Sequence, residues 1–528
     1  MIDKLSALFY TSRFDDEWTL SKKHVAWMLL GIVALWTILC GVSHRAPDLD
    51  GMEELVWASS FELGYFKHPP LPTWLMYGLT SVFGKPVWLT FFAGQLVSAL
   101  ALWFIWLLGC EFTTPKKALI ATLMVSTTMY FSIRGTIYNH NTAQLWSIAA
   151  STWLFYRALR YQKTASWVWL GVVGGLAMMT KYSAAIQFFA FFVFLATHGH
   201  FREKSTVKGI GTAFIAFVVT ISPHLYWLIS HSFSSFSYAE DSIESPGSLL
   251  NTLIELFVFS YNQLGRISPM LIVWVGLYYW NKKSAGRQEA FSPQSYAQEL
   301  SKWDRSFLLW VGLTPFIATV LAAAILQVEL VTSWATTFFI LYGFYAFWWL
   351  SGNEHVNLRR TIVAVILIHV LLALGYAIAR GPLAYYAGRN ARSTFPGAIV
   401  SAEMNKVWLS HVADIPLRLV ASDRWLGGNI AIHTDPKTNV FIDARYNESP
   451  WLNPETALDC GVLIAYSETT LGAPVPEITA LLDRAVWKGV TNVPWSTPNS
   501  PTIVINWGII PPGLGCHLLS NSKNLTKK

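Results

Sequence analysis

Apolar residues run through this chain in long stretches, without the short alternation that is typical of a water-soluble sheet. A helical run of ~20 apolar residues is long enough to cross the hydrocarbon core of a bilayer. About eleven candidate runs lie at 25–43, 86–109, 118–133, 142–156, 166–180, 182–198, 209–229, 267–280, 306–326, 332–351 and 361–379. The pattern therefore predicts an all-α membrane region with about eleven spans.

Beyond residue 380 the pattern changes, because polar residues become frequent and β-rich segments alternate with helical ones. The β-rich segments lie at 417–421, 439–442 and 502–506, and the helical ones at 398–410 and 475–486. A segment of this length can bury a core of its own. We therefore expect a transmembrane domain over residues 1–380 and a small α/β domain over residues 381–528.

Lysine and arginine in the loops predict how the chain is threaded through the bilayer. With the N-terminus in the cytoplasm, the loops on that side hold nineteen Lys and Arg residues and the opposite loops hold six. Cytoplasmic loops carry the excess of positive charge in most membrane proteins. An odd number of spans then places the C-terminal domain on the non-cytoplasmic side.

Composition agrees with a membrane protein and disfavours a nucleic-acid-binding one. Hydrophobic residues make up 53% of the chain and charged residues only 13%, whereas a soluble protein has roughly 25% charged residues. The net charge of +7 comes from short basic pairs at the ends of apolar runs, not from one basic stripe. We expect the bilayer, and no nucleic acid, among the partners.

The four cysteines leave two interpretations open. Cys40 and Cys110 lie in or beside apolar runs, whereas Cys460 and Cys516 both lie in the polar C-terminal region. The latter two can form a disulfide if that region lies in an oxidising compartment, and two free thiols would be equally ordinary. No cysteine or histidine spacing is typical of a zinc site. We predict no cofactor and leave dependence on a divalent metal open.

Ionisable residues gather in the first outside loop, residues 44–85, while no apolar run contains an Asp, Glu, Lys or Arg. A carboxylate beside a cation suits the transfer of a group onto an alcohol or phosphate, because the acid takes a proton and the cation stabilises an anionic leaving group. The alternative is that the acids only solvate the loop while Lys67 and His68 reach toward lipid headgroups. The loop residues alone favour neither interpretation.

Four motifs in order resemble those of the GT-C glycosyltransferases in the protein O-mannosyltransferase and lipid A aminoarabinose transferase superfamily. They are Leu49–Glu53 with Gly64–Leu75, then Gly135–Thr142, Gly171–Ser183 and Ser222–Leu228, and weaker similarity continues at Trp425–Asn429 and Ser449–Trp451. The resemblance covers about residues 25–380. It implies a GT-C bundle that moves a sugar from a polyprenyl-phosphate carrier to an envelope acceptor, with inversion. It also implies a bacterial inner-membrane location, a periplasmic active site, and a lipopolysaccharide or lipid A component, another glycan or a protein as acceptor.

The resemblance also implies roles for individual residues in the transfer reaction. Asp50 lies where the family has its catalytic acid, and Glu53, one helical turn further on the same face, is the second residue that we expect to be catalytic. The residues expected near the carrier phosphate are Tyr65, Lys67, His68, Arg134 and Lys181. On spacing alone, the favoured interpretation of Lys181 is a lysine at a helix end that reaches toward the membrane surface.

One departure from the family concerns the second outside loop. Many relatives have a second acid where this chain has Asn141, within Asn139-His140-Asn141. Asn is not a base at neutral pH, but it can orient a hydroxyl or a phosphate. We expect these three residues and Tyr182 to contact the acceptor or the sugar, although a loop histidine such as His140 is often purely structural.

Two other functions compete with sugar transfer. A transporter or lipid flippase usually needs ionisable groups or broken helices inside the membrane, and the runs of this chain contain no such charge. A non-catalytic assembly protein would keep its function after loss of the loop carboxylates. Substitution of those carboxylates therefore distinguishes this second alternative from an enzyme.

Overall fold

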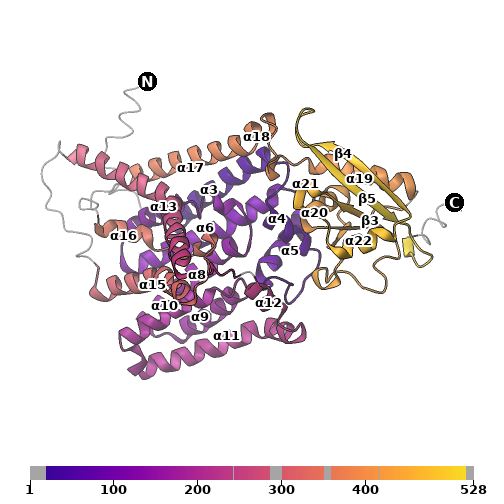
Figure 1. The fold of residues 1–528 in the computed structure, drawn as a ribbon. Helices are drawn as coiled ribbons and strands as arrows, with labels where there is room; N and C mark the ends of the chain where they lie inside the picture. Colours follow the sequence, from indigo (N-terminus) through magenta and orange to yellow (C-terminus); the bar gives the residue numbers. More distant parts are fainter. Residues whose placement is uncertain (1–19, 242, 286–299, 350–357, 414, 519–528) are drawn as a thin grey trace.

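A helical body continues at one end into a small mixed sheet in the computed structural model (Figure 1). The structure describes residues 20–241, 243–285, 300–349, 358–413 and 415–518. Five of the described helices are long and apolar enough to cross a membrane: α3 (Lys22–Ser43), α6 (Trp88–Phe112), α11 (Lys204–Ser230), α15 (Lys302–Leu326) and the stretch Leu358–Tyr386, which holds α17 (Leu358–Arg380) and α18 (Pro382–Tyr386). The chain is thus a helical multi-pass membrane protein, and the figure of eleven spans stays a prediction.

The remaining described helices of the body are shorter or less uniformly apolar. They are α4 (Leu49–Trp57), α5 (Leu71–Phe83), α7 (Pro115–Ser126), α8 (His140–Tyr161), α9 (Thr164–Met178), α10 (Ala184–Thr197), α12 (Ser234–Asp241), α13 (Leu249–Ala285) and α16 (Tyr342–Trp349), with the 3₁₀ turns η1 (Arg134–Thr136), η2 (His200–Arg202) and η3 (Thr332–Ala335). Figure 1 shows α9 and α11 side by side along one edge of the body.

Three of the predicted runs differ from the helices that form. The run at 267–280 is part of the 37-residue helix α13, which begins at Leu249. The first half of α13 was not predicted, because Glu255 and Arg266 interrupt the apolar pattern there. The run at 118–133 is helical only to Ser126, where the hydroxyls of Thr127 and Thr128 donate to the carbonyls of Met124 and Val125. The third run, at 332–351, begins with η3, and its helix starts at Tyr342.

The C-terminal region contains a five-stranded sheet in the order β2-β1-β3-β5-β4. The strands are β1 (Leu419–Ser422), β2 (Asn439–Ile442), β3 (Val462–Tyr466), β4 (Trp487–Pro494) and β5 (Thr502–Ile510), and the helices around them are α19 (Gly397–His411), α20 (Arg424–Thr434), α21 (Glu468–Leu471) and α22 (Pro476–Asp483). The strands β2, β1 and β3 are parallel, while β5 is antiparallel to both β3 and β4. The small α/β region expected from the sequence is present.

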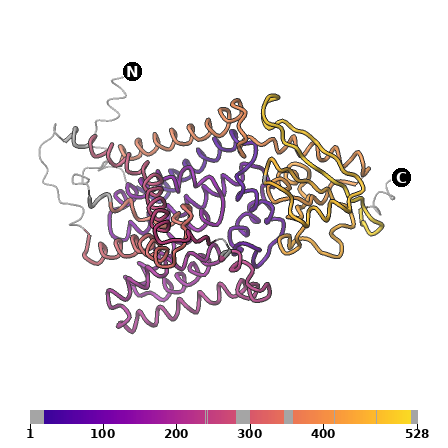
Figure 2. The backbone as a smooth tube through the Cα atoms, viewed as in Figure 1, coloured from indigo at the N-terminus to yellow at the C-terminus, as the bar shows by residue number. Residues whose placement is uncertain are grey.

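The loop at residues 44–85 packs directly against this C-terminal region. Helix α4, from that loop, lies against α20, so segments from the two ends of the chain come together (Figure 2). A Cβ added at Gly428 of α20 would lie 2.6 Å from the Met52 side chain and 3.0 Å from Val56. Met52, Leu55 and Trp425 share one buried apolar cluster. Burial on both sides therefore holds α4 in place, as an element of the core.

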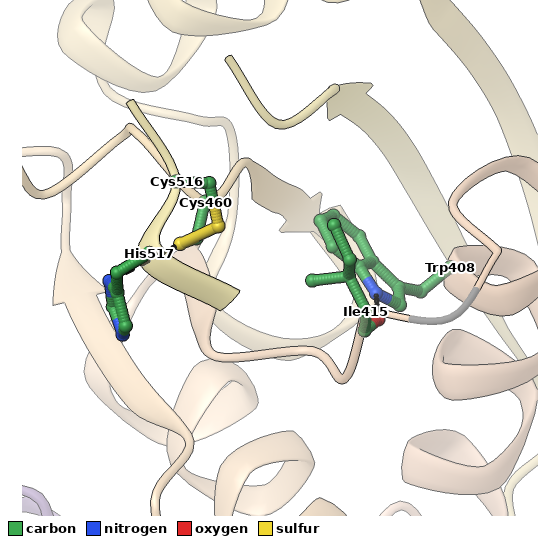
Figure 3. Close-up of a disulfide and its surroundings, with 5 residues drawn as sticks. All are labelled: Trp408, Ile415, Cys460, Cys516 and His517. Atoms are coloured by element: carbon green, nitrogen blue, oxygen red, sulfur yellow. Dashed lines mark hydrogen bonds between the residues drawn. A yellow bond between two sulfur atoms is a disulfide. The ribbon is translucent and has the colours of Figure 1, made fainter. Parts of the chain in front are cut away.

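A disulfide joins Cys460 to Cys516 (Figure 3). It connects the turn before β3 to the segment after β5, across 56 residues. The pairing that the cysteine pattern left open is therefore the one that forms, while Cys40 and Cys110 stay free.

Replacing both Cys460 and Cys516 by Ser is expected to lower the stability of the C-terminal region by about 2 to 4 kcal/mol, since the crosslink restricts the unfolded chain. Thermal unfolding of the detergent-purified protein measures this effect as a lower Tm. The control is Cys110→Ser, which removes a free thiol. Equal Tm values for the double variant and the control would contradict the prediction.

Candidate active site

Helix α4 presents three carboxylates, and its start is set by a side-chain cap. The Asp48 carboxylate accepts a hydrogen bond from the backbone N–H of Leu49 at 2.7 Å, which starts the helix there. Asp50, Glu53 and Glu54 follow within one turn and therefore lie on neighbouring parts of one surface. Each of the three has a different environment.

Asp50 is half-buried and has one partner. The side-chain amide of Asn139 donates to its Oδ2 at 2.8 Å. Burial raises the pKa of Asp50, the hydrogen bond from Asn139 opposes the rise, and the nearby Glu53 adds to it. Among the described residues no hydrogen bond engages its second oxygen, so this carboxylate can still accept a proton or a hydrogen bond.

The Glu53 carboxylate interacts with two cations, Lys67 and Arg424. Its side chain is almost fully buried, and Oε1 lies 2.8 Å from Lys67 Nζ and 3.1 Å from Arg424 Nε. The Lys67 contact is a hydrogen-bonded ion pair, whereas the Arg424 contact lacks hydrogen-bond geometry at Nε and is an electrostatic one. Because Arg424 begins α20, this carboxylate fastens the first loop to the C-terminal region.

Glu54 points into the protein. The Thr73 hydroxyl donates to its Oε2 at 2.8 Å, and burial raises the pKa of Glu54 to about 8. This carboxyl is therefore mostly protonated at neutral pH. Of the three acids, only Asp50 combines partial exposure with an oxygen that is not engaged.

The N-terminus of α8 connects the acid on α4 to a half-buried lysine, Lys181. The Asn139 side chain caps α8 by accepting from Thr142 N at 2.9 Å, while its amide holds Asp50. Two residues later, Asn141 Oδ1 accepts a hydrogen bond from Lys181 Nζ at 2.5 Å. The positive end of the α8 dipole lies at these residues and favours a bound anion beside them.

Lys181 lies between α9 and α10, and burial lowers its pKa to about 7. Its Nζ lies 5.8 Å from the centroid of the Trp334 ring, on η3. Arg266 of α13 donates from Nη1 to the carbonyl of Thr332, on the same 3₁₀ turn, at 3.0 Å. The 3₁₀ turn η3 therefore contacts both Lys181 and a second cation, Arg266. The sequence motifs did not predict Arg266 at this site.

His68, in the loop at residues 44–85, lies close to His140, the first residue of α8. The ring centroids of His68 and His140 are 3.8 Å apart. Burial lowers the pKa of His68 to about 3 and lowers that of His140 well below its usual value, and the charges of Lys181 and Lys67 act in the same direction. Both imidazoles are therefore neutral at pH 7, so each can donate a hydrogen bond but cannot supply a charge.

Three further residues expected at the site interact with groups other than Asp50. Tyr65 stacks on Trp57, with ring centroids 5.4 Å apart, and its hydroxyl donates to the Ser60 carbonyl. The hydroxyl of Tyr182 lies 2.8 Å from His224 Nε2 and 2.8 Å from Ser235 Oγ. The remaining residue, Arg134 of η1, is half-buried, and its charge acts on Tyr130 and Arg266. No contact found among the described residues joins it to Asp50 or Lys181.

Two cations at or near the site, Arg424 and Arg266, could not be found from local sequence. Arg424 is 371 residues from its partner Glu53, and no motif spacing relates the two. Within the described part of the chain, no three His, Cys, Asp or Glu side chains form a group that could hold a metal ion.

Comparison with known proteins identifies relatives of one kind. A family model described as dolichyl-phosphate-mannose-protein mannosyltransferase matches residues 67–227. The lipopolysaccharide core galacturonosyltransferase RgtB of Rhizobium johnstonii is 27% identical over 219 residues, which are 39% of this chain and 43% of that protein. The core galacturonosyltransferase RgtA of the same organism is 21% identical over 431 residues, 77% of this chain and 79% of that protein. The match thus spans less than half the length of RgtB but most of RgtA.

Among solved structures, ArnT from Cupriavidus metallidurans is similar over nearly the whole chain. Its crystal structure bound to undecaprenyl phosphate gives a TM-score of 0.58 at 11% identity and covers 92% of this chain and 98% of that one. The apo structure gives a TM-score of 0.58 at 12% identity with the same coverage. At this identity the similarity establishes a common fold, which is the fold predicted from the ordered motifs.

Proposed function

We propose that this chain is a glycosyltransferase of the GT-C superfamily that includes the protein O-mannosyltransferases and lipid A aminoarabinose transferases, and that it glycosylates lipopolysaccharide at the periplasmic face of a bacterial inner membrane. The donor is a polyprenyl-phosphate sugar, and the acceptor is the core oligosaccharide or lipid A. The observation that carries the proposal is the start of α8, where Asn139 holds Asp50 and Asn141 holds Lys181. An acid and a cation thus lie on either side of one short segment.

In this reaction Lys181 and the N-terminus of α8 bind the carrier phosphate. His68 and His140, which are neutral, donate hydrogen bonds to the phosphate or to the sugar. The acceptor oxygen attacks the anomeric carbon, the bond from that carbon to the phosphate oxygen breaks, and the carrier phosphate leaves as an anion that Lys181 stabilises. Asp50 accepts the proton of the attacking hydroxyl. A single displacement of this kind inverts the anomeric configuration.

The two asparagines and Glu53 have positioning roles in this proposal. Asn139 orients the Asp50 carboxylate, and Asn141, which stands where many relatives have an acid, orients Lys181 toward the phosphate. Glu53 holds Lys67 and Arg424, so we assign it to the placement of cations rather than to proton transfer. The raised pKa of Asp50 makes its carboxylate a stronger base, which suits removal of the proton from the acceptor hydroxyl.

The compartment and the substrates are supported by separate observations. The positive charge of the predicted cytoplasmic loops and the Cys460–Cys516 disulfide both favour an oxidising, non-cytoplasmic location for the C-terminal region. The structural neighbour ArnT binds undecaprenyl phosphate, which supports a polyprenyl-phosphate donor. The relatives RgtA and RgtB act on lipopolysaccharide core, which supports a glycan acceptor.

Mass spectrometry of lipid A and core oligosaccharide tests the proposal directly. A deletion strain is expected to lose the mass of one sugar from one of these fractions, and the wild-type gene is expected to restore it. Purified protein should transfer the sugar in detergent, where no ion gradient exists. Unchanged lipopolysaccharide in the deletion strain, or a requirement for a gradient, would favour the transporter alternative.

The pH dependence of donor use follows from Lys181. Its pKa of about 7 means that the ammonium is present below pH 7 and lost above it, and only the charged form pairs with the phosphate. The kcat/KM for the donor should therefore fall about tenfold between pH 6 and pH 8. Lys181→Arg keeps its charge throughout this range and should lose this alkaline decline. The same decline in both proteins would assign it to another group.

A further inference from the structure

The C-terminal region contains a cavity of about 230 Å³ that the mechanism above does not use. It opens at the carboxyl ends of the three parallel strands. Asp423 follows β1, Asp443 follows β2, and Tyr466 and Ser467 lie at the end of β3. The strand β1 lies between β2 and β3, so the chain crosses over β1 on its way from β2 to β3. Ligands of α/β sheets bind at such a point, outside the carboxyl ends of the strands.

The lining of the cavity combines hydrogen-bonding groups with an apolar wall. One oxygen of Asp423 accepts from the backbone N–H groups of Trp425 and Leu426. The carboxylate of Asp443 forms no hydrogen bond with the described residues. Burial raises the pKa of Asp443, and the nearby charge of Asp423 raises it further. Across from the strand ends lies the loop 472–475, with Pro474 and Val475, and Ile478 of α22 completes the wall.

The backbone at Asp443 is held in an unusual conformation. Its φ is +50°, and φ of the next residue, Ala444, is +57°. Non-glycine residues rarely adopt this left-handed region, and where they do the strain is often connected with function. At Asp443 it places a half-buried carboxylate at the edge of the cavity, without a hydrogen bond to its side chain among the described residues.

These groups match a neutral sugar better than an anion. The cavity has two carboxylates against one guanidinium, and that guanidinium also faces Glu53. A phosphate or a uronic acid would be repelled, whereas vicinal hydroxyls donate to carboxylates and the C–H face of a sugar ring packs on Pro474 and Val475. The volume lies below the ~300 to 1,000 Å³ of pockets for drug-sized ligands, so a single sugar residue fits better than a longer glycan.

Arg424 connects the cavity to the candidate active site. Its side chain lines the cavity, and its Nε lies 3.1 Å from Glu53 on α4, one helical turn from Asp50. The close packing of Gly428 on Met52 fixes α20, which carries Arg424, against α4. A ligand in the cavity is therefore held at a constant position relative to the proposed base.

We propose that this cavity is an acceptor subsite, which binds one neutral, hydroxyl-rich sugar residue of the acceptor glycan and so presents the neighbouring hydroxyl to Asp50. The assignment rests on the proposed function, because it presumes a glycan acceptor. It gives the C-terminal region a specific task, the recognition of the acceptor.

Binding and kinetics of the full-length, detergent-purified protein test the subsite. The probe is core oligosaccharide released from lipopolysaccharide by mild acid, with its affinity measured by calorimetry. Asp443→Asn removes the charge and suits the positive φ, because Asn tolerates this conformation. Ala473→Trp fills the cavity from an exposed loop, and Glu455→Gln changes an exposed carboxylate outside it.

Asp443→Asn and Ala473→Trp should each weaken oligosaccharide binding at least tenfold and raise the KM for the acceptor as much, with kcat within twofold of wild type. Glu455→Gln should bind like wild type, and inorganic phosphate should not displace the oligosaccharide. Wild-type affinity in both cavity variants, or displacement by phosphate, would overturn the subsite while leaving the transfer reaction intact. Loss of oligosaccharide binding in the variants, together with no sugar transfer by the wild-type protein, would overturn the proposed function and keep the cavity as a sugar-binding site.

Discussion

Asp50→Ala and Asp50→Asn should each lower the rate of sugar transfer by about 10²- to 10⁴-fold, the usual contribution of a general base. Asp50 is the one acid on α4 that combines partial exposure with an unengaged oxygen among the described residues. The amide of Asn cannot take the proton of the acceptor hydroxyl. Initial rates with a polyprenyl-phosphate sugar and isolated lipopolysaccharide measure the loss.

Glu54→Gln is the matched control for this experiment. It makes the same change from carboxyl to amide on the same helix, four residues further along. Because the pKa of Glu54 is raised to about 8 by burial, its carboxyl is already mostly neutral at pH 7, and the amide should preserve activity within a few-fold. Wild-type rates in both Asp50 variants would remove Asp50 from the chemistry, and the proposed mechanism would fail.

Glu53→Ala should destabilise the protein by about 3 to 5 kcal/mol, the cost of leaving a buried charge without its partner. The side chain of Lys67 is only 8% exposed, and Glu53 is its ion-pair partner. Arg424 is 26% exposed, so water screens part of its loss. The expected result is a clearly lower Tm and loosened contact between α4 and α20.

A double-mutant cycle separates this structural role from a catalytic one. Lys67→Met combined with Glu53→Gln removes both charges of the closer pair and should recover part of the Tm that either single change loses. Asp483→Ala is the control, because its pair with Lys488 spans 3.9 Å and is well exposed, and such pairs contribute little. A normal Tm with a 10²-fold slower reaction in Glu53→Gln would instead make Glu53 a catalytic acid or base.

The extent to which the sequence predicted the site differs from residue to residue. The first two motifs led to Asp50, His68 and Asn139, and the third led to Lys181; the structure brings these side chains together. The motif pointed to Asp50, but the sequence did not show that Glu53 and Glu54, acids on the same short helix, have other roles. The distinct partners of these three acids, Asn139, Lys67 with Arg424, and Thr73, come from elements far apart in the chain.

By itself the sequence determined that the chain is a helical membrane protein with a small α/β region and a first loop that resembles that of GT-C glycosyltransferases, because hydrophobic run length and ordered local motifs are properties of contiguous residues. It overlooked the first half of α13 and the strands β3 and β4. In β4, exposed polar positions such as Lys488 and Asn492 weaken the apolar pattern. Only the tertiary structure decided that α4 packs on α20, that the start of α8 joins Asp50 to Lys181, and that a cavity at the carboxyl ends of three strands reaches Glu53 through Arg424. Those arrangements depend on burial and charge pairing between residues up to 371 positions apart, and no local pattern encodes them.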